Sequence, residues 1–124
     1  MQTTSNIIQK YVNGWKTNDR DKILSVLTED CIIIESHGPT YTGKKAISRW
    51  IDDWIHKGNV VNQFDILSYY WSKDVVFVEW IFECTVNDKI HRIEGCSIFK
   101  FRDGAISFIR EYRTTKLLYP LFGD

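Results

Sequence analysis

The stretch "VVFVEWIFECTV", residues 75–86, decides the fold, because apolar residues recur in it at every second position. One parity holds Val76, Val78, Trp80, Phe82, Cys84 and Val86, and the other holds Phe77, Glu79, Ile81, Glu83 and Thr85. A period of two predicts a β-strand with one face against a core. The turn signals "SKD" at 72–74, "ND" at 87–88 and "RDG" at 102–104 divide the second half into four long strands with tight connections. We therefore expect an antiparallel meander.

Helical spacing governs the first half of the chain. The apolar positions of a first helix, which runs to about Thr17 after the capping candidates 3–5, are Ile7, Ile8, Tyr11, Val12 and Trp15. Asp19 is a suitable N-cap for a short second helix, and a third helix ends at Lys57 and Gly58. Its apolar positions are Ile47, Trp50, Ile51, Trp54 and Ile55. Helices first and an antiparallel sheet second predict an α+β cone, in which the helices cover one face of a curved sheet.

Size and charge bound the function. The chain has 124 residues, which predicts one domain over 1–124. Lys and Arg number 16 and balance 16 Asp and Glu, so no basic surface favours nucleic acid. The start "MQTTSNIIQK" is polar, which predicts a cytoplasmic protein without a signal peptide or membrane anchor.

Cysteine and histidine give no metal or cofactor motif. Cys31, Cys84 and Cys96 are odd in number and far apart, which favours buried thiols over disulfides or a zinc site. The histidines, at 37, 56 and 91, have no metal-ligand spacing, and neither a phosphate-binding loop nor a dinucleotide fingerprint occurs. We therefore expect no cofactor and no bound metal.

The segment "LTEDCIIIESHG", residues 27–38, ends a run of isoleucines on a carboxylate, Glu35. Glu35 shares strand parity with Cys31 and Ile33, and isoleucines on both parities predict that both faces of the strand are covered. A carboxylate buried there must pair, become neutral or take part in chemistry. The alternatives are a frayed, solvated strand end or a structural ion pair with an arginine. Gly and Pro predict a loop over the following "SHGPTYTG", residues 36–43.

Three segments carry a resemblance to a known family: "YVNGWKTNDRDKILSVLTED" at 11–30, "YTGKKAISRW" at 41–50 and "FKFRDGAISFIREYRTT" at 99–115. In this order they resemble the SnoaL-like branch of the NTF2-like superfamily, which also includes steroid delta-isomerases, scytalone dehydratase, limonene epoxide hydrolase and polyketide cyclases. The resemblance implies an NTF2-like (cystatin-like) cone with a mostly antiparallel sheet. Because the superfamily hosts many chemistries, it implies the fold more strongly than the function.

Set against ketosteroid isomerases, Tyr11 in "KYVNGW" matches a tyrosine that donates a hydrogen bond, and Glu35 in "IIIESHG" matches a carboxylate base. The resemblance thus implies Glu35 and Tyr11 as catalytic residues. Ser97 in "SIFKF" stands where those isomerases carry an aspartic acid, and Thr114 in "EYRTT" stands where many cyclases carry an acid. The chain departs from the enzyme pattern at both positions.

Other residues are candidates for substrate binding. Arg110 shares parity with Ile106, Phe108 and Tyr112, so it either faces the pocket, to neutralise Glu35 or bind a substrate carboxylate, or reaches solvent at the strand end. Ser97 is a weak hydrogen-bonding group or a small filler, and His37 is an acid, a base, an orienting group or an exposed loop residue. The aromatic residues expected to line the pocket are Trp15, Trp54, Phe99 and Tyr112.

Two functions follow from these residues. The first is a cofactor-independent enzyme that moves a proton next to a carbonyl of a small hydrophobic ligand, as an isomerase, dehydratase or cyclase does. The second is a non-catalytic ligand-binding or dimerisation module. Apolar residues on the outer strand parity, such as Phe77 and Ile81, favour a homodimer through the sheet face in either case.

Overall fold

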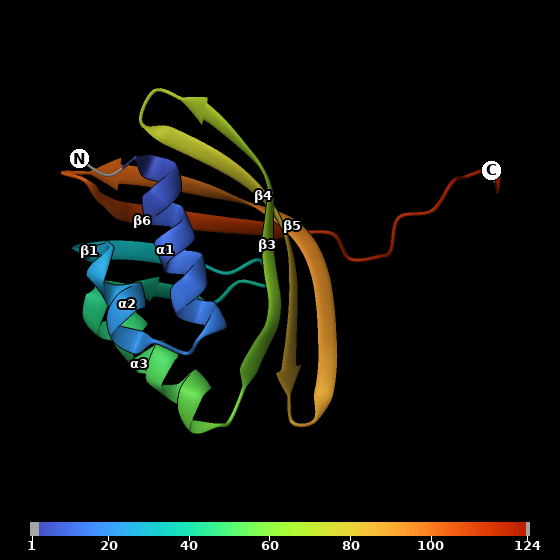
Figure 1. Ribbon diagram of the computed structural model, residues 1–124, viewed down its shortest axis with the longest axis horizontal. Coiled ribbons are helices and arrows are strands. Elements are labelled where there is room, and N and C mark those ends of the chain that lie inside the picture. Colours follow the sequence, from blue (N-terminus) through green and yellow to red (C-terminus); the bar gives the residue numbers. More distant parts are fainter. Residues whose placement is uncertain (1–2, 124) are drawn as a thin grey trace.

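A computed structural model describes residues 3–123. Three helices, α1 (Thr4–Lys16), α2 (Arg20–Ser25) and α3 (Lys44–His56), precede the four long strands in the sequence (Figure 1). The strands are β1 (Leu27–Ile34), β2 (Thr40–Thr42), β3 (Val60–Ser72), β4 (Val75–Val86), β5 (Lys89–Arg102) and β6 (Ala105–Arg113). They form one curved sheet in the order β2-β1-β6-β5-β4-β3. The predicted α+β cone and the four long C-terminal strands are confirmed.

The sheet is mostly antiparallel, and among the strand pairs within residues 3–123 only β1 and β6 run parallel. Two hairpin turns have positive φ at both central residues: Asn87 and Asp88 at 52° and 63°, and Asp103 and Gly104 at 52° and 78°. Such turns match the right-handed twist of the strands they join, and Asn, Asp and Gly tolerate them best. The "ND" and "RDG" turn predictions therefore hold.

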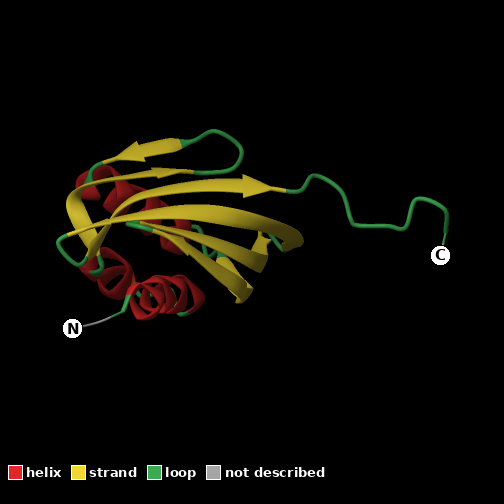
Figure 2. Cartoon of the chain, turned by 90° about the horizontal axis from the view of Figure 1, so that it is seen from above, coloured by secondary structure: helices red, strands yellow, loops and turns green. Residues whose placement is uncertain are grey.

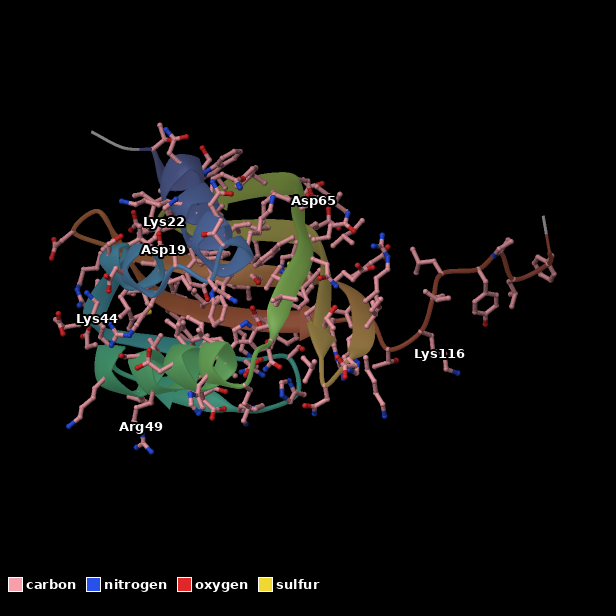
Figure 3. The ribbon with its side chains drawn as sticks, turned by 60° about the horizontal axis from the view of Figure 1, so that its bottom comes forward. Asp19, Lys22, Lys44, Arg49, Asp65 and Lys116 are labelled. Carbon is pink, nitrogen blue, oxygen red and sulfur yellow. The ribbon has the colours of Figure 1, made fainter. Side chains whose placement is uncertain are left out.

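The helix caps also follow the sequence. The Thr3 hydroxyl accepts a hydrogen bond from the Asn6 backbone at 3.2 Å, and the Asp19 carboxylate accepts one from the Lys22 backbone at 3.0 Å. The helices gather on one side of the sheet (Figure 2), and α3 presents charged side chains such as Arg49 outward (Figure 3). The inner sheet face and the helices therefore enclose the core.

The core fills only part of the space between these layers. Its fully buried aliphatic residues are Ile8, Val12, Ile23, Ile33, Ile47, Ile51, Val76, Val78, Ile106 and Ile109. They come from all three helices and from β1, β4 and β6. Aromatic side chains line the remaining space, where the packing leaves a cavity.

Strand β2 was predicted as loop, and that prediction is wrong. It pairs with β1 so that Tyr41 lies opposite Ile33. Three residues are too short to show a period, and their strand exists only because β1 supplies hydrogen-bonding partners.

The predicted parity of β6 is also wrong at its C-terminal end. Lys100 pairs with Phe108 but Phe101 pairs with Ile106, so Ser107 is an extra residue, a β-bulge. A bulge of one residue exchanges the faces of every side chain beyond it. Arg110 and Tyr112 therefore lie on the outer face, where the Arg110 guanidinium stacks 5.0 Å above the Tyr112 ring.

The chain leaves the sheet after β6 as an extended tail that runs away from the helices (Figures 1 and 2), with Lys116 near its start (Figure 3). Its large side chains are more than 70% exposed: Leu117, Leu118, Tyr119, Leu121 and Phe122. The outer face of the sheet also carries exposed aromatic residues, among them Tyr70, Phe77 and Tyr112. Within the described residues, none of the helices has the length and hydropathy needed to cross a membrane.

Candidate functional site

A cavity of about 430 Å³ opens between the helices and the inner face of the sheet. Its lining comes from α1, α3, the loop after β1, and strands β3 to β6. The lining residues are Tyr11, Trp15, Glu35, Ser36, His37, Trp50, Trp54, Phe64, Trp80, Phe82, Cys84, Val86, His91, Ile93, Glu111 and Arg113. Four of the five tryptophans belong to it. An apolar cavity of this size with a few polar groups is typical of small-molecule sites.

The aromatic walls of the cavity support one another. The ring centroids of Trp15 lie 4.8 Å from Trp50 and 6.1 Å from Trp54, and Tyr41 stacks on Trp50 at 4.3 Å. Aromatic pairs at such distances stabilise a packing beyond the area they bury. The helical spacing that predicts a core-facing stripe thus also supplies a wall of the cavity.

Trp80, on the sheet side of the cavity, is held by a residue of the neighbouring strand β5. Its indole Nε1 donates a hydrogen bond to the Ser97 hydroxyl at 2.8 Å, and both residues are buried. Ser97 was a candidate for ligand binding, but its oxygen already accepts from Trp80, and the residue is not part of the cavity lining. It fixes the orientation of a lining tryptophan.

Glu35 lies directly after β1 and faces the cavity, on the same side as the fully buried Cys31 and Ile33. The Tyr41 hydroxyl donates a hydrogen bond to its Oε1 at 2.7 Å. Tyr41 comes from β2, so the short strand missed by the sequence prediction supplies the partner of this carboxylate. Burial and this charge together raise the pKa of the Tyr41 phenol, which stays a donor.

Sequence reasoning also missed Glu111 of β6. The parallel register pairs Ile33 with Ile109 and Ile34 with Arg110, so its next step sets Glu35 beside Glu111. Burial, and then the negative charge of Glu35, raise the pKa of Glu111 to about 8. At neutral pH this carboxyl is mostly protonated, and a neutral acid therefore lies next to a charged carboxylate. The resemblance puts the acid of the cyclases at the position of Thr114, which is not acidic. Glu111 faces the cavity because of the bulge at Ser107, which the sequence pattern does not show.

Tyr11 completes the polar end of the cavity. Tyr11 is 3% exposed, and its ring packs edge-on against Trp15 at 6.4 Å and Phe99 at 6.0 Å. Burial and the nearby Glu111 raise the pKa of the Tyr11 phenol well above 10. The phenol therefore stays protonated and can donate a hydrogen bond into the site.

The predicted site residues fall into three groups. Those that line the cavity are Tyr11, Trp15, Glu35, His37 and Trp54. Ser97 and Phe99 are buried behind the wall, while Arg110 and Tyr112 lie on the other face of the sheet. Residues 3–123 contain no cluster of three or more His, Cys, Asp or Glu side chains that could hold a metal ion.

Solved structures with the same fold are numerous. A protein of Catenulispora acidiphila with a ketosteroid isomerase-like fold, solved with trimethylamine, is 17% identical over 91% of this chain and 88% of its own, with a TM-score of 0.76. A Mycobacterium tuberculosis epoxide hydrolase resembling limonene epoxide hydrolase is 15% identical over 88% and 80%, with a TM-score of 0.79. A provisionally assigned isomerase of Bacillus subtilis is 21% identical over 89% and 85%, with a TM-score of 0.78. At these identities the likeness shows the fold alone.

No curated protein matches the chain. The family model described as a SnoaL-like domain matches residues 8–109, which span α1 to most of β6. Together with the cone and its cavity, this match shows that the chain belongs to the SnoaL-like domain family.

Proposed function

We propose that the protein catalyses proton transfer next to a carbonyl group of a small hydrophobic substrate. The observation that supports this function is the pair of carboxyl groups in one aromatic cavity, with Glu35 charged and Glu111 neutral. Two titratable groups whose environments drive their protonation apart are suited to act as base and acid. Isomerisation, dehydration and intramolecular aldol cyclisation all use this step.

Each group has a role in the proposed reaction. Glu35 removes a proton from the carbon next to the carbonyl, and negative charge develops on the carbonyl oxygen. Tyr11 and the protonated Glu111 donate hydrogen bonds to that oxygen, which stabilises the enolate. Glu35 then returns its proton to another carbon in an isomerisation, or Glu111 gives its proton to a departing hydroxyl group in a dehydration. Tyr41 orients Glu35 throughout.

The test is exchange of α-protons for deuterium. A panel of small cyclic ketones is incubated with the protein in D₂O, and the α-proton signals are followed by NMR. Glu35→Gln should lower the exchange rate about 10²- to 10⁴-fold, since that is the usual contribution of a positioned base. Glu29→Gln is the matched control, because the Glu29 side chain is 89% exposed on the surface. Full activity of Glu35→Gln would exclude the assignment.

A second reaction is favoured by the same carboxyl pair. Glu111 can protonate the oxygen of an epoxide while Glu35 takes a proton from the attacking water, which gives a diol. Here Glu111→Gln should abolish diol formation from small epoxides, whereas ketone exchange should persist at a reduced rate because Tyr11 remains. Saturable ligand binding with neither reaction would instead support a non-catalytic binding module.

A homodimer through the outer sheet face is part of this proposal. Exposed aromatic residues on that face, including Tyr70, Phe77 and Tyr112, support it, because contiguous exposed apolar surface usually marks an interface. Sedimentation equilibrium should give twice the chain mass at micromolar concentration, and a monomer would contradict it. We also place the protein in the cytoplasm, which its free Cys31, Cys84 and Cys96 support.

A further inference from the structure

The polar side chains of the cavity are sorted by depth. Tyr11 is buried, and Glu35 and Glu111 are partly buried, so the acidic groups occupy the inner end. His37, His91 and Arg113 also line the cavity but are exposed, so they form its rim. Of the lining tryptophans, Trp15 and Trp80 are buried and Trp50 and Trp54 are partly buried, so the tryptophans extend to the depth of the acidic groups. The cavity therefore has histidine and arginine side chains at its rim and carboxyl groups in its interior.

The rim side chains have no partners of their own. Among residues 3–123, His37, His91 and Arg113 make no side-chain hydrogen bond and no ion pair. Arg113 comes from the last position of β6, beside Gly95 of β5, two residues after Glu111 on the same strand face. Its planar guanidinium offers five donors in the geometry that matches a carboxylate.

We propose that the substrate carries a carboxylate, which Arg113 binds at the rim beside His37, while its hydrophobic body lies among the tryptophans and its reactive end meets Glu35. Only the contact of the reactive end with Glu35 rests on the proposed function. The binding of the carboxylate is inferred from the placement of the rim side chains alone.

Charge fixes the direction in which such a substrate enters. A carboxylate at the inner end would lie beside the charge of Glu35 and would lose its hydration in an aromatic environment. At the rim it keeps part of its hydration and gains a bidentate partner. A neutral ligand has no such preference, so the rim selects an amphipathic acid over its uncharged analogue.

The test uses a matched pair of ligands, 2-naphthoate and 2-naphthamide, which share one ring system and differ in charge. Binding is measured by quenching of tryptophan fluorescence, since four of the five tryptophans line the cavity. The wild-type protein should bind the acid about tenfold more tightly than the amide at low salt, as expected for one charge-assisted contact. Arg113→Gln should abolish this preference without weakening the amide, and Arg113→Lys should retain part of it.

Arg92→Gln is the control. Arg92, on β5, is exposed like Arg113, but it lies on the outer face of the sheet, where it contacts Gln63 at 2.7 Å and Glu83 at 3.8 Å. It should leave both affinities unchanged. Equal affinity of the wild type for the two ligands, no binding of the acid, or an unaltered preference in Arg113→Gln would each overturn the proposal. Glu35→Gln separates the two hypotheses, because it should abolish exchange while naphthoate binding stays as tight or becomes tighter.

Discussion

Glu111 should make the protein less stable as the pH rises from 5 to 8. In the unfolded chain this carboxyl has its ordinary pKa of 4.5, whereas in the native protein burial and Glu35 raise the pKa to about 8. The native state therefore binds more protons than the unfolded state between these values, and stability falls with increasing pH across this window. Below pH 4.5 the contribution is fully present.

The size of the effect follows from the two pKa values. With 1.36 kcal/mol for each unit of pKa, proton linkage gives a loss of up to about 3.5 kcal/mol between pH 5 and pH 8. Water at the partly buried carboxyl screens some of this cost, so we expect about 2 kcal/mol or more. Glu111→Gln removes the titration and keeps the shape of the neutral acid.

The assay is urea denaturation of the wild type and Glu111→Gln at pH 5, 6, 7 and 8. The variant should gain stability relative to the wild type at each step, and Glu35→Gln should reduce the slope because the Glu35 charge contributes to the raised pKa. The scan stops at pH 8, since burial raises the pKa of Cys31 to about 12 and thiol titration in the unfolded chain adds its own loss above that range. A difference between wild type and Glu111→Gln that changes by less than about 0.5 kcal/mol would refute the reasoning.

Three further outcomes can be measured by urea denaturation at pH 7. Gly95→Ala should destabilise the protein by about 1–3 kcal/mol, because the new Cβ would lie 2.6 Å from Cη2 of Trp80 in a packed wall; wild-type stability would show that the wall yields. Ser97→Ala should cost about 1–3 kcal/mol, because the buried Trp80 Nε1 loses its acceptor, and a loss below 0.3 kcal/mol would mean that another acceptor replaces it. Truncation after Lys116 should change the stability by less than about 0.5 kcal/mol, because the tail side chains are exposed; a larger loss would reveal contacts between tail and domain.

Wherever strand pairing is regular, the sequence predicted which residues face inward. Glu35 shares parity with Cys31 and Ile33, and all three face the interior, since β1 pairs in step with β6 from Ile32 to Ile34. The alternation in β4 also predicted the two faces correctly, since each residue from Val75 to Val86 pairs in step with β5. Local period is sufficient in such strands because side chains alternate strictly between the two faces.

Two parts of the site depend on pairing rather than on local pattern. Tyr41 reaches Glu35 only because β1 gives three residues of a Gly- and Pro-containing segment a strand partner. Glu111 faces the cavity only because Ser107 is extra in β6. Neither event changes the composition or spacing of the sequence around it, so the Gly and Pro content predicts a loop at Tyr41, and strict alternation in β6 puts Arg110, not Glu111, on the face of Ile106.

The bulge at Ser107 determines which chemistry the cavity supports. Without the extra residue, Arg110 and Tyr112 would face inward and Glu111 would face outward. A guanidinium beside Glu35 would neutralise it as a structural ion pair, which is the alternative that the sequence left open. With the bulge, Glu111 is instead buried beside Glu35, and burial, together with the negative charge of Glu35, raises the pKa of Glu111 into the range useful for acid catalysis. The same shift brings Arg113 to the rim, so one backbone irregularity positions both the proposed acid and the proposed carboxylate receptor.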